Sequence, residues 1–142
     1  MSIDKFNSEG YYDPTSYEAM TNVAKADKQS AFRPLVYICS PFSGDTERNS
    51  EQARKYSRFA YEQNTIPVTP HLLYPQFMDD GSPAERELAL FMGMVLLTKC
   101  EQMWVFGSVI SSGMRAEIAK AEKKNIPVRY FTEELEEMPC AN

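Results

Sequence analysis

The sequence predicts an α/β sandwich, Rossmann-like and of the flavodoxin-like kind, with helices on both faces of a parallel sheet of about four or five strands. Apolar runs rich in β-branched and aromatic residues recur at 35–39, 65–69, 103–106 and 126–131. Helical patterns separate these runs. Continuous apolar runs are typical of strands buried on both faces, and strands that alternate with helices form parallel sheets with right-handed crossovers.

The first helix is expected from about Glu47 to Gln63, after a cap at Asp45 or Thr46. Three of its apolar positions recur at helical spacing: Ala53, Tyr56 and Ala60. Pro67 lies in the second apolar run and favours an edge strand or a strand start. The stretch 70–81 then predicts a long loop, which in a compact domain is typical of a lid or a binding wall.

A second helix is predicted over 83–98 by a strong start signal. Ser82 is a favourable cap, Pro83 suits the first helical position, and Glu85 follows three residues after the cap. From Leu88 to Leu97 the pattern is apolar on every face. Such a helix lies either deep in the core or at a subunit interface. We favour the interface, and so expect a homo-oligomer formed through helix 83–98.

The stretch from Met103 to Lys124 predicts a strand, a serine-rich loop and a helix. The helix has an apolar stripe at Met114, Ile118 and Ala121. A fourth strand is expected over 126–131, and Thr132 is expected to cap a final acidic turn or short helix over 133–137.

Length and composition indicate one α/β domain over 34–142, preceded by an N-terminal arm over 1–33 for which disorder is the alternative. The net charge of −5 disfavours polymeric nucleic acid as a partner. No apolar run is long enough to span a membrane, and the first residues lack a signal-peptide pattern. Three cysteines without a C-x-x-C pair are typical of a cytoplasmic protein, and a single histidine argues against a metal site. No cofactor is expected.

Three loops follow the carboxyl ends of predicted strands, at 40–45, 70–81 and 107–113. Ligands of open α/β sheets bind at this edge, and serine hydroxyls with helix amides suit a phosphate or a ribose. Ordinary tight loops are the alternative, and neither a dinucleotide nor a Walker motif is present. The residues expected to contact a ligand are Ser40, Pro41, Phe42, Ser43, Gly44, Arg48, His71, Asp80, Ser111, Ser112 and Gly113.

Glu117 is the carboxylate nearest the start of the helix after the third strand. It lies about 60° around the helix from Met114, at the border of the buried face. A carboxylate there points across the ligand crevice. The alternative is a solvated glutamate paired with Lys120 one turn later.

The segment Gly113-Met114-Arg115-Ala116-Glu117-Ile118 resembles the glycine-x-x-x-glutamate segment of the nucleoside 2-deoxyribosyltransferase superfamily. The first strand and its loop, 36–42, resemble that superfamily's first strand as well. The resemblance implies that Glu117 is a nucleophile that attacks an anomeric carbon and that Tyr37 positions it. Glu87 occupies the place of the superfamily's aspartate, and we rank it ahead of Asp79 and Asp80 as the acid that protonates the leaving base.

Taken together, these features predict a protein that binds a nucleoside or nucleotide and cleaves or transfers its N-glycosidic bond through a covalent glycosyl-glutamate, as a transferase or a hydrolase. A non-catalytic nucleotide-binding or sensing module of the same fold is the alternative. An assembly protein built around the apolar helix 83–98 is a third possibility.

Overall fold

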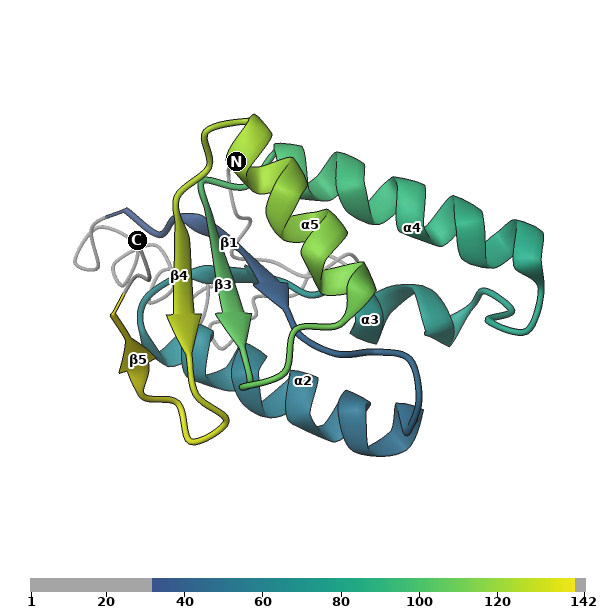
Figure 1. Cartoon of the computed structure of the whole chain (residues 1–142), viewed down its shortest axis with the longest axis horizontal. Coiled ribbons are helices and arrows are strands. Elements are labelled where there is room, and N and C mark those ends of the chain that lie inside the picture. Colours follow the sequence, from purple (N-terminus) through teal and green to yellow (C-terminus); the bar gives the residue numbers. More distant parts are fainter. Residues whose placement is uncertain (1–31, 140–142) are drawn as a thin grey trace, which may run out of the picture. The chain divides into compact units, whose positions relative to one another are not determined.

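The computed structural model describes residues 32–139, so the predicted arm over 1–33 falls almost wholly outside the described part. The described residues contain a five-stranded sheet in the order β2-β1-β3-β4-β5 (Figure 1). The strands are β1 (Leu35–Cys39), β2 (Ile66–Val68), β3 (Gln102–Phe106), β4 (Val128–Phe131) and β5 (Glu137–Met138). The first four are parallel, which confirms the predicted α/β class, and β2 is an edge strand as its proline indicated.

Two layers of helices enclose the sheet (Figure 1). The helical segments are α2 (Thr46–Glu62), α3 (Pro70–Leu73), the 3-10 turn η1 (Tyr74–Gln76), α4 (Pro83–Thr98) and α5 (Ser112–Lys123). Helix α2 covers one face, while α4 and α5 cover the other. The chain leaves β1 toward β2 on one side and returns past β1 to β3 on the other. This reversal opens a crevice at the carboxyl ends of β1 and β3, where ligands of such sheets bind.

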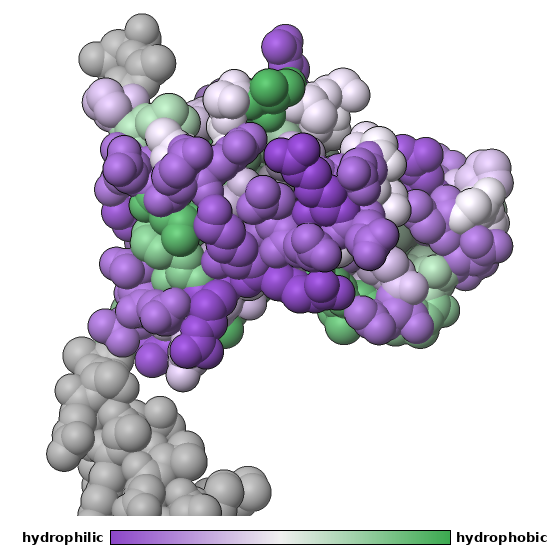
Figure 2. Space-filling view, turned by 90° about the horizontal axis from the view of Figure 1, so that it is seen from below, coloured by the Kyte–Doolittle hydropathy of each residue, from purple (hydrophilic) through white to green (hydrophobic). Residues whose placement is uncertain are grey.

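The alternation of side chains along β1 creates a separate core on each face of the sheet. Val36 and Ile38 pack toward α2 with a cluster of aromatic rings from the sheet and α2, including Tyr56, Trp104 and Phe106. Tyr56 stacks on Phe106 at 4.4 Å between ring centroids. The face of the molecule in Figure 2, on the side of α2 in Figure 1, is mostly hydrophilic, as an amphipathic outer helix requires.

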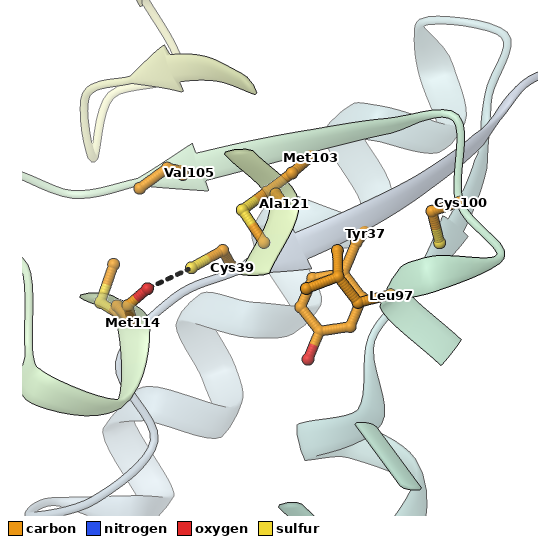
Figure 3. Packing of buried hydrophobic residues seen from close by; sticks show 8 residues of the cluster. All are labelled: Tyr37, Cys39, Leu97, Cys100, Met103, Val105, Met114 and Ala121. Carbon is orange, nitrogen blue, oxygen red and sulfur yellow. Dashed lines mark hydrogen bonds between the residues drawn. The ribbon is translucent and has the colours of Figure 1, made fainter. Parts of the chain in front are cut away.

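The core under α4 and α5 contains Tyr37 and Cys39 of β1 and apolar side chains of both helices. Figure 3 shows this cluster, with the thiol of Cys39 directed at the backbone oxygen of Met114, 4.0 Å away. Met114 and Ala121 are buried on the inner face of α5, as the predicted stripe requires. Tyr37 and Met114 of this core also border the crevice.

One sequence prediction about local structure was wrong. The stretch 70–81 is not a plain loop, because Pro70 starts α3 and the 3-10 turn η1 follows it directly. Residues 133–135 form a turn after Thr132, whose hydroxyl accepts from the Glu136 amide, so the acidic turn predicted there is confirmed and its alternative, a short helix, is not. Leu135 adopts a positive φ of 71° in a turn, and β5 then pairs antiparallel with β4, where Arg129 and Glu137 form an ion pair at 2.7 Å.

Helix α4 begins as its cap predicted, with the Ser82 hydroxyl accepting a hydrogen bond from the Glu85 amide. It does not lie deep in the core, which excludes one of the two explanations of its apolar sequence. Four large side chains are exposed along it: Leu88, Leu90, Phe91 and Val95. The homo-oligomer through this helix stays a prediction. Within residues 32–139, no helix has the length and apolar character needed to cross a bilayer.

Candidate active site

A pocket of about 350 Å³ opens at the carboxyl ends of β1 and β3. Its walls come from the β1–α2 loop, from α3 and η1, from the first turns of α4, and from the start of α5. The volume lies in the range of small-molecule sites. The apolar part of its lining includes Phe42, Pro70, Tyr74, Leu90 and Met94. The polar lining includes serine hydroxyls, His71, Arg86 and several carboxylates.

Glu117 on α5 is half-buried in this pocket. Its carboxylate accepts a hydrogen bond from the hydroxyl of Tyr37 on β1, and the thiol of Cys39 lies 4.0 Å from its Oε1. Burial raises the pKa of Glu117 to about 7, against a smaller lowering by the Tyr37 hydrogen bond. No ion pair joins it to Lys120 among the described residues. The carboxylate therefore belongs to the pocket and not to a surface pair.

The start of α5 places Glu117 there. Ser111 caps the helix, its hydroxyl accepting from the Met114 amide at 3.2 Å. The cap sets the helical register, so Met114 turns into the core and Glu117 follows at its border. The predicted geometry of this segment agrees with the structure.

Tyr37 reaches the pocket from beneath α4 because Gly93 lies opposite its hydroxyl. A Cβ built on Gly93 would lie 3.5 Å from the Tyr37 oxygen, so larger side chains there would crowd it. Burial and the neighbouring Glu117 carboxylate raise the pKa of Tyr37 far above its usual range. The phenol stays protonated and acts as a donor to Glu117.

His71 and Ser40 form a second polar group in the pocket. The His71 ring stacks on Phe42 at 5.3 Å, with 12° between the planes, and bonds to the Ser40 backbone. Burial lowers the pKa of His71, so the ring is neutral at pH 7. The His71 Nε2 and the Ser40 Oγ are both buried without a hydrogen-bond partner.

Carboxylates and one arginine line the remaining wall. Glu85, half-buried on α4, accepts from the Asp79 amide at 3.4 Å. Asp79 in turn accepts from the Gly81 amide at 2.9 Å. Asp80 and Arg86 also line the pocket and are exposed. Glu85 is thus the most enclosed acid of this wall.

Comparison with protein-family models matches residues 34–131 to a family described as a domain of unknown function, DUF7768. The chain belongs to this family. A search of curated proteins finds no match to this chain. Among solved structures, it is similar to the 2-deoxyribosyltransferase of the psychrotolerant bacterium Bacillus psychrosaccharolyticus, a biocatalyst for nucleoside synthesis. That likeness has a TM-score of 0.54 and 16% identity, covers 69% of this chain and 72% of the other, and shows a common fold.

The pocket of the DUF7768 domain brings together most of the residues expected from sequence: Tyr37, Ser40, Phe42, Ser43, His71, Asp80, Ser111, Ser112, Gly113 and Glu117. Four others do not line it: Pro41, Gly44, Arg48 and Glu87. Arg48 and Glu87 are both exposed. The acid ranked first from the sequence, Glu87, therefore lies outside the pocket that contains Glu117.

Sequence reasoning missed part of the pocket of the DUF7768 domain, chiefly on α4. Glu85, Ala89 and Gly93 recur every four residues and line one wall, with Arg86, Leu90 and Met94 beside them. This spacing was a usable signal, because residues four apart lie on one helical face. The run from Leu88 to Leu97, which is apolar on every face of the helix, obscured it. Among the described residues, no group of histidine, cysteine and acidic side chains is placed to hold a metal ion.

Proposed function

We propose that this protein binds a nucleoside or nucleotide in the pocket and cleaves or transfers its N-glycosidic bond. The observation that carries the proposal is the Tyr37–Glu117 pair, a carboxylate held inside the pocket by a protonated phenol. The fold, which is similar to that of a 2-deoxyribosyltransferase, supports the same chemistry.

The reaction proceeds by two displacements at C1′. A Glu117 carboxylate oxygen attacks C1′, and the C1′–N bond breaks with its electron pair leaving on the base nitrogen. An acid delivers a proton to that base. The resulting ester between the sugar and Glu117 is then attacked by water or by a second base, which restores the free carboxylate. Water gives hydrolysis, and a second base gives transfer.

The environment of Glu117 suits a nucleophile that works near neutral pH. With a pKa of about 7, a large fraction of its carboxyl groups is ionised at pH 7, while burial keeps the anion poorly solvated. The Tyr37 hydroxyl offsets part of the cost of ionisation and fixes the direction of the carboxylate. With only the Tyr37 hydroxyl and the Cys39 thiol as donors among the described residues, the carboxylate keeps lone pairs that can face C1′.

The proton donor is proposed to be Glu85, replacing Glu87 as the first choice. Glu85 lines the pocket and is half-buried, whereas Glu87 is exposed and does not line it. Asp79 and Asp80 line the same wall but are more exposed, so Glu85 is the acid best shielded from water.

The test is release or exchange of the base from a panel of ribo- and deoxyribonucleosides and their 5′-monophosphates, followed by chromatography. Wild-type protein is expected to release base, and Glu117→Ala to lose that activity by at least about a thousand-fold, as loss of a nucleophile does. Glu122→Ala on the exposed side of the same helix is the matched control and keeps full activity. A 2′-fluoro nucleoside slows the second step, so intact mass spectrometry would detect a glycosyl adduct on Glu117.

The alternative of a binding module makes a different prediction for the same panel. Such a module would bind nucleosides without releasing base, and Glu117→Ala would leave the dissociation constant unchanged. The raised pKa of Glu117 favours the enzyme, because perturbed ionisable groups in pockets are concentrated at catalytic sites.

A further inference from the structure

Two buried polar atoms of the pocket remain unpaired: the Ser40 Oγ and the His71 Nε2. Both residues line the pocket, and Ser40 is only 2% exposed. An unpaired buried polar atom is unfavourable, and native proteins retain few of them. Neither residue has a role in the displacement at C1′. The pair therefore requires a separate explanation.

The bonding of His71 defines what this pair offers to a ligand. Because Nε2 has no partner, the hydrogen bond between the ring and the Ser40 backbone comes from Nδ1, and it is donated to the carbonyl. The proton of the neutral ring is then on Nδ1, and Nε2 carries a free lone pair. Nε2 is an acceptor, while the Ser40 hydroxyl both donates and accepts.

We propose that Ser40 and His71 form an uncharged hydrogen-bonding subsite that binds an O–H or N–H group of the substrate. The ligand group donates to His71 Nε2 and accepts from, or donates to, Ser40 Oγ. Both atoms are shielded from water in the free protein, so binding includes a rotation of the Ser40 side chain or of the Phe42 ring that stacks on His71. This inference rests on the proposed function and names the part of the pocket that selects the substrate.

The charges around the pocket make unphosphorylated nucleosides the ligands of this subsite. A phosphate has no proton to donate to Nε2 at pH 8, and it would meet Asp79, Asp80 and Glu85 with only Arg86 to offset them. The amides at the start of α2 are no substitute for a phosphate site, since the Asp45 carboxylate already accepts from the Arg48 amide there. Arg48 itself does not line the pocket.

The donor group has two possible sources on a nucleoside, a sugar hydroxyl or the exocyclic amine of the base. Calorimetry with four probes separates them: 2′-deoxyadenosine, its 5′-deoxy analogue, its analogue without the amine, and its 5′-monophosphate. The protein is the Glu117→Gln variant, which removes turnover. We expect tenfold or weaker binding of whichever analogue lacks the recognised group, and weaker binding of the monophosphate than of the nucleoside.

Two substitutions test the residues in the same Glu117→Gln background. Ser40→Ala removes the hydroxyl, and His71→Asn keeps a donor near the Nδ1 position while removing the Nε2 acceptor. Each is expected to weaken binding of 2′-deoxyadenosine at least tenfold. Ser40→Ala is expected to keep or raise the melting temperature of the free protein, because the lost hydroxyl had no partner. Ser108→Ala, exposed and outside the pocket, is the control.

Unchanged affinity in both variants would overturn the subsite, as would tighter binding of the monophosphate than of the nucleoside. A lower melting temperature of free Ser40→Ala with unchanged affinity would assign the hydroxyl a structural role instead. A different measurement tests the proposed function: it would be contradicted if wild-type protein released no base from the nucleoside panel. Binding of 2′-deoxyadenosine through Ser40 and His71 without any release of base would support the subsite and contradict the proposed enzymatic activity.

Discussion

The hydroxyl of Tyr37 donates a hydrogen bond to the carboxylate of Glu117, and so joins β1 to α5, the helix that follows β3. Parallel pairing of β1 with β3 brings the two residues together, since Tyr37 is level with Met103 and the chain then turns back through α5.

Glu117→Gln should remove a pH dependence of stability. The carboxyl has a pKa of about 7 in the folded protein against an ordinary value of 4.5, so the folded state binds more protons between these values. The unfolding free energy of wild-type protein therefore falls as pH rises from 4.5 to 7, with a ceiling of about 3 kcal/mol from this group.

Melting temperatures measured at pH 5 and pH 8 check this effect. Glu117→Gln is expected to gain stability relative to wild type at pH 8 and little at pH 5. Glu122→Gln, on the exposed side of α5, should follow the wild-type slope. Parallel slopes for wild type and Glu117→Gln would contradict the burial of the carboxyl.

Tyr37→Phe should raise the pKa of Glu117 above about 7, because the hydrogen bond that it removes lowers this pKa. The rising limb of the pH profile of kcat/KM then moves to higher pH, and activity at pH 7 falls by roughly ten-fold while recovering in part at pH 8.5. The phenyl ring retains the packing of Tyr37. A profile that falls uniformly at every pH would indicate a structural role alone.

Gly93 should tolerate alanine and reject larger side chains. An alanine Cβ would make ordinary contact with the Tyr37 hydroxyl at 3.5 Å, and removing a helical glycine stabilises by up to about 1 kcal/mol. Gly93→Ala is therefore expected to melt at or above the wild-type temperature with nucleoside binding retained. Gly93→Leu should fill the pocket and abolish binding in calorimetry. Equal affinity of the leucine variant would place the ligand elsewhere.

Glu85→Gln and Glu87→Gln form a matched pair for the proton donor. The glutamines keep the size of each side chain, and only Glu85 lines the pocket. Base release should fall by about a hundred-fold in Glu85→Gln, as loss of a general acid does, and stay near wild type in Glu87→Gln. Substrates whose bases leave without protonation should narrow the difference. The reverse ranking would restore Glu87 as the acid.

The apolar surface of α4 should mediate self-association. Phe91 is 64% exposed and lies beside Leu88 and Val95, so Phe91→Glu is expected to leave the fold intact and convert an oligomer to monomers. Light scattering after size-exclusion chromatography measures the mass of each species. Val109→Glu, which alters an exposed loop residue, is the control and should retain the wild-type mass. A monomeric wild-type protein would contradict the interface.

The sequence by itself determined the fold class and the position of the nucleophile candidate. Buried parallel strands leave long apolar runs, and helix caps such as Ser82 and Asp45 act through their nearest neighbours, so local sequence carries both signals. Helical period alone placed Glu117 at the border of the buried face.

Only the tertiary structure decided which side chains surround Glu117. Glu85 and Glu87 are two residues apart on one helix, and the orientation of α4 against the sheet determines which of them lines the pocket. The isolation of Ser40 Oγ and His71 Nε2 depends on the packing of the β1–α2 loop against α3, two segments that are distant in sequence. Burial likewise raises the pKa of Glu117 through atoms from several elements. These properties arise from contacts between distant segments, which no local pattern encodes.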